Sequence, residues 1–241
     1  MLRIAEIGSN YRNFADILLY IDQLAADVIK LQHYDSTDLY GVPDRCKSVM
    51  LSDGDLEEAK YRCDSNEKQL MISFFNHEKV KTYNHFVDYH KVASSEITYL
   101  QLLEEMANTG KDVFVSTGGA TYQQVCKAVE IIGRERIILM ECNVEYPTNS
   151  ACPYNAKNMG FYHNCRYGFS DHSKEIYSTY ELSRQYGCYA WEKHVKFHGL
   201  TGTPDAEFAI TVDEFNNSPH VPKRLPNPHQ RILKDGKWVR P

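Results

Sequence analysis

Short apolar runs recur along the chain, and each ends near glycine, serine or another polar residue. Runs of this length between turn residues are typical of strands buried on both faces, as in parallel sheets. The predicted strands are residues 2–8, 27–32, 70–74, 89–94, 112–116, 136–140, 166–170 and 189–194.

Between most of these runs, apolar residues recur at helical spacing. After Asn13, a residue type that caps helices, Phe14, Ile17, Leu18 and Ile21 would share one face. The helices predicted in this way are residues 14–24, 56–65, 78–87, 98–110, 121–132 and 174–186. Eight strands alternating with helices predict an α/β fold, a (β/α)8 or TIM barrel. The length of 241 residues is close to the ~250 typical of that fold.

Two units of the predicted barrel look shortened. Residues 147–164 show no helical pattern, so we expect a loop after the sixth strand. After His194 the periodicity is lost, and a helix starting near Asp213 is soon stopped by Pro219, so the eighth unit is short as well. We therefore predict a barrel domain over residues 1–215 and an extended, proline-rich C-terminal tail over residues 216–241.

Composition narrows the classes of function. A net charge of −5 without any basic run argues against a nucleic-acid partner. No segment approaches the ~18 apolar residues of a membrane span. Arg3 follows the start too closely for a signal peptide, and the seven cysteines are odd in number and lack CxxC spacing. We therefore expect reduced thiols in a cytoplasmic protein.

Polar residues gather where the predicted strands end, which is where barrels carry their active sites. Lys30 and Lys91 interrupt apolar strands, and a buried lysine is costly unless an anion or acid meets it. His172 and His194 lie about one βα unit apart, so neighbouring strands could bring their imidazoles to one metal ion. The alternatives are structural histidines, lysines that reach solvent at strand ends, and a packing role for Tyr146.

A series of motifs resembles one family, in order, from about Ile4 to Phe215. The motifs are Ala5-Glu6-Ile7-Gly8, Val28-Ile29-Lys30-Leu31-Gln32, Lys91-Val92-Ala93-Ser94-Ser95-Glu96, Ser116-Thr117-Gly118-Gly119-Ala120-Thr121, Glu145-Tyr146-Pro147-Thr148, Gly168-Phe169-Ser170-Asp171-His172, Glu192-Lys193-His194 and Gly202-Thr203-Pro204-Asp205. Together they resemble the sialic acid synthase family, which includes the N-acetylneuraminate, legionaminate and pseudaminate synthases.

The resemblance implies a specific reaction. Members of that family condense phosphoenolpyruvate with an open-chain N-acyl amino sugar aldehyde, giving a 2-keto-3-deoxy sugar acid, a nonulosonate, and phosphate. By resemblance, a divalent metal, Mn²⁺ or Mg²⁺, would be held by His172 and His194. The implied phosphoenolpyruvate-binding residues are Lys30, Lys91, Ser94, Ser116 and Ser170. The residues implied around the aldehyde, metal or sugar hydroxyls are Glu6, Glu96, Tyr146, Glu192 and Asp205.

The chain also departs from the family pattern. Ser95 replaces a glycine, and Tyr11, Glu141 and Ala206 stand where the family has histidines. Family members continue into a small antifreeze-like domain that contacts the sugar, and we expect that contact to be missing here. The phosphoenolpyruvate and metal halves of the site thus look retained, and the sugar half altered.

Three functional classes follow. The first is an active synthase with an unusual acceptor aldehyde, which retention of both lysines and both histidines favours. The second is a degenerate barrel that serves as a binding protein, and the third is a metal-dependent aldolase or lyase with another acceptor. The short eighth unit would expose apolar strand surface, so we also predict a homodimer. We expect the tail to lie against its own barrel or that of the partner subunit. Its residues Lys234, Lys237 or Arg240 would then approach the neighbouring site.

Overall fold

The computed structural model describes residues 1–35, 38, 50–149, 153–175 and 178–218, and only the backbone of residues 177, 232–234 and 237–239. The predicted tail side chains Lys234, Lys237 and Arg240, and most of the loop before residue 50, lie outside the described residues.

Eight parallel strands close into a barrel, which confirms the predicted fold. Each strand pairs with the next along the chain, and β1 pairs with β8 to close the ring. The strands are β1 Leu2–Glu6, β2 Val28–His33, β3 Gln69–Phe74, β4 Tyr89–Val92, β5 Val113–Ser116, β6 Ile137–Cys142, β7 Arg166–Asp171 and β8 Ala190–Lys196. A short ninth strand, β9 (Ile210–Thr211), adds to β8 in parallel.

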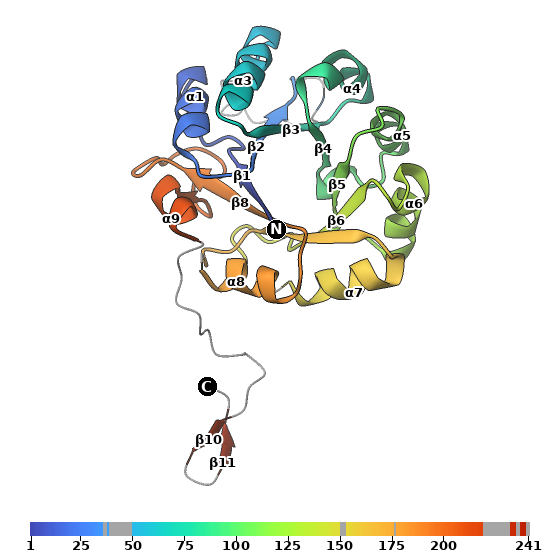
Figure 1. The fold of residues 1–241 in the computed structure, drawn as a ribbon, viewed down its shortest axis with the longest axis vertical. Coiled ribbons are helices and arrows are strands. Elements are labelled where there is room, and N and C mark those ends of the chain that lie inside the picture. The colour runs from blue at the N-terminus through green and yellow to red at the C-terminus, as the bar shows by residue number, and fades with distance from the viewer. Residues whose placement is uncertain are drawn as a thin grey trace.

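The helices form a ring outside the strands (Figure 1). They are α1 Phe14–Gln23, α3 Asp53–Ser65, α4 His77–Tyr83, α5 Leu100–Asn108, α6 Tyr122–Ile132, α7 Tyr154–His163, α8 Tyr177–Gln185 and α9 Val212–Asn217. Two 3-10 turns, Asn84–Phe86 and Ser94–Glu96, flank β4. Beyond the barrel, β10 (Ile232–Lys234) and β11 (Lys237–Val239) pair in antiparallel fashion. Among the described residues, no helix is long and apolar enough to cross a membrane.

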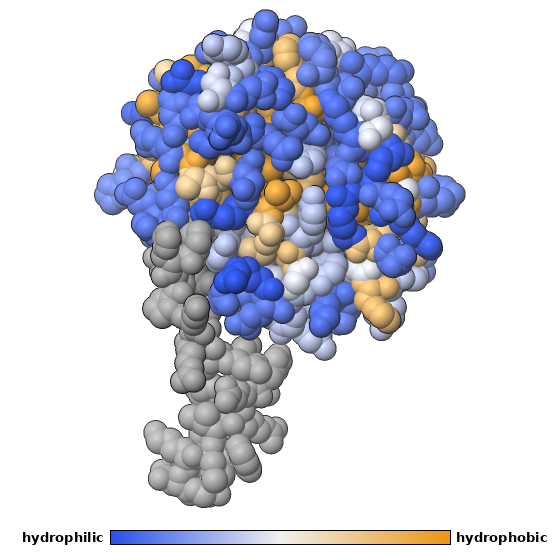
Figure 2. Space-filling model, in the orientation of Figure 1, coloured by the Kyte–Doolittle hydropathy of each residue, from blue (hydrophilic) through white to orange (hydrophobic). Residues whose placement is uncertain are grey.

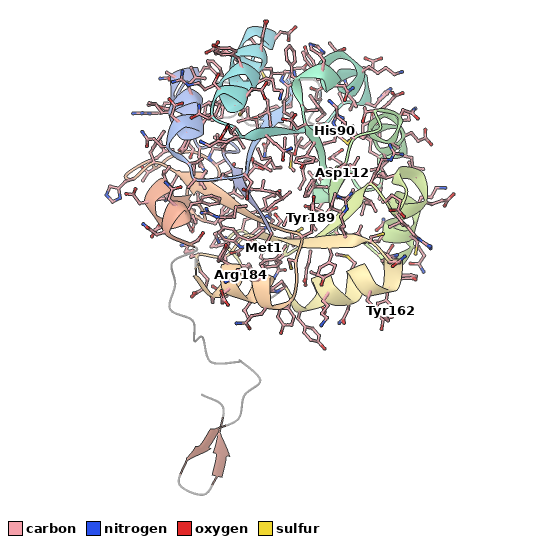
Figure 3. The ribbon with its side chains drawn as sticks, viewed as in Figure 1. Met1, His90, Asp112, Tyr162, Arg184 and Tyr189 are labelled. Carbon is pink, nitrogen blue, oxygen red and sulfur yellow. The ribbon has the colours of Figure 1, made fainter. Side chains whose placement is uncertain are left out.

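The core has two layers, because successive strand residues point to opposite faces. A small cluster fills the barrel, and a larger one lies between the sheet and the helices. The inner residues are Ile4, Val28, Met71, Phe114, Ile138, Met140 and Ala190. Figure 2 shows hydrophilic residues over most of the surface, with apolar ones in scattered patches, one of them near the middle of the face in view. In the same view, Met1 and Tyr189 lie near the centre of the ring and Tyr162 lies at its outer edge (Figure 3).

The prediction of a loop between β6 and β7 is wrong, because helix α7 (Tyr154–His163) occupies the sixth unit. Its buried face is made of Ala156, Gly160 and His163 rather than large apolar residues. A Cβ atom on Gly160 would lie 2.1 Å from the Tyr167 ring, so the helix packs very closely on β7. Because the buried face carries small and polar residues, the sequence lacks the apolar periodicity that predicts a helix.

The eighth unit is short, as predicted, but it does not expose its strand. Helix α9 spans only Val212–Asn217, yet its Phe215 is fully buried and stacks on Trp191 of β8, with ring centroids 5.6 Å apart. Arg3 donates to the carbonyl of Phe215 and lies over its ring. The exposed apolar strand from which we predicted a homodimer is therefore covered. The homodimer stays a prediction without that support.

Candidate active site

A cavity of about 340 Å³ opens where the strands end. On β8, Glu192 and His194 point into the barrel and Lys193 points outward, because side chains alternate along a strand. The residues that line the cavity are Lys30, Gln32, Ser73, Lys91, Ala93, Ser94, Ser95, Ser116, Cys142, Tyr146, Ser170, His172, Glu192, His194, Pro204, Asp205 and Phe208.

Two buried lysines line the cavity, together with the carboxylates Glu192 and Asp205. Lys30 and Lys91 are 4% and 3% exposed, so their ammonium groups have little contact with water. Lys91 donates to Ser116 Oγ over 2.7 Å, and Lys30 forms an ion pair with Glu6 at the end of β1. Burial lowers the pKa of Lys30 to about 7, against the opposing effect of Glu192. An anion placed between these lysines would favour their charged forms.

Glu192 is an ionised carboxylate inside the barrel. It accepts a hydrogen bond from Ser170 over 2.8 Å, and its Oε1 lies 3.9 Å from Lys91 Nζ. Burial acts to raise the pKa of Glu192, but Lys91 and Lys30 outweigh it and lower the pKa to about 2. Its Oε2 is buried and finds no hydrogen-bond partner in the described part of the chain. This oxygen is therefore available to a ligand.

The two histidines face the same cavity from neighbouring strands. The ring centroids of His172 and His194 are 5.8 Å apart, with 62° between the ring planes. His172 Nδ1 lies 2.6 Å from the carbonyl oxygen of Asn143. Since a carbonyl only accepts, this nitrogen carries the proton, and Nε2 presents its lone pair on the side of Ser170, 3.5 Å away.

Both imidazoles are held neutral, which is the form that ligates metals. Burial lowers the pKa of His172, and it lowers that of His194 to about 3. A ligating histidine commonly donates its other ring nitrogen to a carbonyl, as His172 does. The pair therefore fits a divalent cation. Within the described ranges, however, no group of three His, Cys, Asp or Glu side chains could hold one. Water and substrate oxygens would have to complete the shell.

The loop after β8 closes one side of the cavity. Asp205 accepts hydrogen bonds from the Ser9 amide and hydroxyl over 2.8 and 2.9 Å. Phe208, which is buried, lies against His194 and Tyr146, with ring centroids 4.8 and 5.0 Å apart. Tyr146, in turn, stacks on His172 at 4.1 Å. Aromatic rings thus border both imidazoles.

Most of the predicted site residues converge on this cavity. The five residues assigned to phosphoenolpyruvate, both histidines, Tyr146, Glu192 and Asp205 all line it. Glu6 does not line the cavity but contacts it through Lys30. Glu96 lies half-buried in a 3-10 turn and is not part of the lining. The expectation that Glu96 lies in the site is therefore not supported, because the turn carries Ser94 and Ser95 to the cavity instead.

Other lining residues were not predicted. Gln32 could have been found, since it lies two residues beyond Lys30 and so points to the same face. Phe208 lies in a loop without hydrophobic periodicity, so no sequence pattern predicted its place in the cavity. The unusual residues Tyr11, Glu141 and Ala206 are not among the lining residues. Instead, Glu141 accepts from the Ala156 amide over 2.6 Å at the start of α7.

Comparison with known proteins assigns the chain to a family. A model described as the NeuB family matches residues 20–219. The chain belongs to the NeuB family. The cavity described above lies at the strand ends of this NeuB-family barrel.

Relatives with similar sequences include proteins with and without an assigned activity. The chain is 29% identical to the uncharacterized protein MJ1065 of Methanocaldococcus jannaschii, over 92% of this chain and 71% of that protein. It is 24% identical to N,N'-diacetyllegionaminic acid synthase of Campylobacter jejuni, over 88% of this chain and 72% of the synthase.

Solved structures show the same barrel. N-acetylneuraminic acid synthetase from Leptospira borgpetersenii, solved in complex with citrate, superposes with a TM-score of 0.84 at 26% identity. The match covers 90% of this chain and 80% of that one. A truncated 3-deoxy-D-arabino-heptulosonate 7-phosphate synthase from Thermotoga maritima superposes with a TM-score of 0.69 at 15% identity, a likeness of fold alone.

Proposed function

We propose that this protein condenses phosphoenolpyruvate with an N-acyl amino sugar or another aldehyde, giving a 2-keto-3-deoxy sugar acid and phosphate. The observation that carries the proposal is the convergence of Lys30 and Lys91 on the same cavity as His172 and His194. Similarity to a legionaminic acid synthase and to a sialic acid synthetase structure supports it.

In this proposal, the lysines and hydroxyls bind phosphoenolpyruvate. Its phosphate and carboxylate need several positive and hydrogen-bonding groups within a few ångströms, and charge-assisted hydrogen bonds supply most of the affinity. The residues that would do this all line the cavity: Lys30, Lys91, Ser94, Ser116 and Ser170. The depressed pKa of Lys30 gives the site a further property, because an arriving anion would draw a proton onto this amine.

His172 and His194 would hold a divalent cation, Mn²⁺ or Mg²⁺, beside the aldehyde. When bound, such a cation polarises the aldehyde carbonyl as a Lewis acid. The chain's own contribution is to keep both imidazoles neutral and to hold the proton of His172 on Nδ1 through the carbonyl of Asn143.

The bond-forming step joins C3 of phosphoenolpyruvate to the aldehyde carbon, whose oxygen takes up a proton. Positive charge then develops at C2, and the ionised Glu192 would stabilise it. Water adds at C2 and loses a proton, which leaves a hydroxyl there. The bond between C2 and the phosphate oxygen then breaks, the hydroxyl proton passes to the departing phosphate, and the 2-keto group forms. Asp205 and Tyr146, which also line the cavity, would contact the acceptor. We give Glu96 no role.

The test is release of inorganic phosphate from phosphoenolpyruvate in the presence of Mn²⁺ and a panel of aldehydes, with N-acylated amino sugars compared with unmodified sugars. We expect phosphate release that depends on both the aldehyde and the metal, together with a product larger than the acceptor by the mass of pyruvic acid. Binding of phosphoenolpyruvate without turnover on any aldehyde would instead favour a binding protein.

A further inference from the structure

A second charged network lies on the outer face of β7 and β8, directly behind the two histidines. Asp171 and Lys193 are paired across the two strands, and their side chains are fully buried. Lys193 Nζ lies 2.8 Å from Asp171 Oδ2 and also donates to the carbonyl of Ser173. Neither residue lines the cavity. They are therefore separated from it by the strands themselves.

The carboxylate of Asp171 is saturated with donors. Its Oδ1 accepts from the amide and hydroxyl of Ser173 over 2.8 and 2.7 Å, and its Oδ2 accepts from Thr179 of α8 over 2.6 Å as well as from Lys193. The network therefore ties the end of β7, the loop after it and helix α8 to β8. In the sequence, His172 lies between Asp171 and Ser173, which are both hydrogen-bonded within this network.

A buried ion pair is weak grounds for stability, because the cost of removing two charges from water offsets their attraction. In other proteins, well-packed apolar residues of similar volume often replace such a pair without loss of stability. What a fully bonded pair adds is a fixed geometry, since each hydrogen bond constrains the backbone on either side of His172 and before His194. The orientation of both imidazoles depends on that backbone.

We propose that Asp171 and Lys193 are positioning residues that set the orientation of His172 and His194 toward one shared cation. This inference rests on the proposed function in so far as it names a cation. His172 is supported on two other sides, because the Thr148 amide donates to its carbonyl and Asn143 accepts from its ring. The ion pair supplies the support from behind.

The test compares Lys193→Met, the doubly neutral Asp171→Asn/Lys193→Met and the control Arg166→Met. Arg166 forms a bidentate pair with Asp112 at the other end of β7, with two bonds of 2.7 Å, so its loss probes strand stability away from the histidines. The double variant guards against misfolding, because it leaves no unpaired buried charge. The three readouts are thermal unfolding, Mn²⁺ affinity by calorimetry, and the imidazole ¹⁵N spectrum of the histidines.

We expect both Lys193 variants to weaken Mn²⁺ binding by about tenfold or more, the range seen when groups supporting a metal ligand are lost. We also expect His172 to lose its fixed Nδ1–H tautomer. Arg166→Met should lower the melting temperature and leave both properties unchanged. An unaltered spectrum with Mn²⁺ affinity within twofold of the parent protein would overturn the proposal. If the parent protein binds no Mn²⁺, the metal part of the proposed function fails, and the spectrum still decides whether the pair positions His172.

Discussion

Gly8 and Asp205, far apart in sequence, meet so closely that a Cβ atom on Gly8 would lie 2.3 Å from Asp205 Oδ2 and 3.3 Å from His194 Nδ1. Gly8 also has a φ of +56°, a conformation that costs other residues ~1–2 kcal/mol. The contact joins the end of β1 to the loop that closes the cavity. Disturbing this contact should therefore lower activity as well as the stability of the fold.

Gly8→Ala should displace Asp205 and reduce phosphate release by at least about tenfold, because sub-ångström placement of reacting groups governs rate. The matched control is Gly110→Ala, since Gly110 has a φ of +76° and no described atom lies within 4 Å of its added Cβ. Both variants carry the cost of a positive φ, but Gly8→Ala should lose more stability in urea unfolding, because its Cβ also displaces Asp205. Equal activity in the two would show that the close contact is irrelevant to catalysis.

Lys91→Met should raise the KM for phosphoenolpyruvate by about 10- to 100-fold, because a hydrogen bond to a charged group is worth ~1.5–3 kcal/mol. Lys111→Met is the control, since Lys111 is half-buried and donates to the carbonyls of Asn84 and Val87, away from the cavity. Steady-state kinetics with a saturating aldehyde gives the comparison. An unchanged KM in Lys91→Met would remove the lysine from the anion site.

His172→Ala and His194→Ala should each abolish Mn²⁺ binding and turnover while preserving the far-UV circular dichroism spectrum, because both residues lie at the strand ends. His77→Ala, which loses a bond of 2.7 Å between His77 Nδ1 and the Tyr99 hydroxyl, should retain both properties. Turnover that survives in either cavity variant would be incompatible with a metal shared by the two rings.

Acid should destabilise the protein in part through two buried histidines outside the site. His33 and His90 both contact Phe74, and burial lowers their pKa values to about 4 and about 3, from 6.5 in the unfolded chain. Below pH 6.5 these histidines become protonated in the unfolded state but stay neutral in the folded state. Stability is therefore complete above pH 6.5 and falls as the pH drops toward 4 and then 3.

Each histidine can contribute at most about 1.4 kcal/mol per pH unit, and the share of His33 should be smaller because solvent reaches it more easily. Urea unfolding at pH 7 and pH 5 measures the loss. His90→Leu should flatten the dependence, whereas Lys81→Met, which changes an exposed ion pair with Glu105, should not. A parent protein equally stable at both pH values would contradict this account.

We expect a homodimer in solution, although α9 covers the strand surface that suggested it. Sedimentation at micromolar concentration, with and without the residues from Pro219 onward, measures both the subunit count and any contribution of the tail. A monomer at these concentrations would end this prediction.

The order and type of the barrel strands could be predicted from the sequence, because buried parallel strands are short apolar runs and need no distant information to be seen. Lys30, Lys91, His172 and His194 were found for the same reason. Each is a polar residue in or just after such a run, and alternation along the strand fixes the face to which it points. The sequence by itself therefore determined the strands and several of the polar residues that line the cavity.

Only the tertiary structure decided how the remaining parts meet. Helix α7 buries Gly160 against Tyr167, and Phe208 reaches both imidazoles from an aperiodic loop. The Asp171–Lys193 pair forms across two strands, although its members look like ordinary charged residues in sequence. Such contacts depend on the shape and distance of partners from other elements. A local pattern records whether a residue is apolar, but not how closely a distant backbone approaches it.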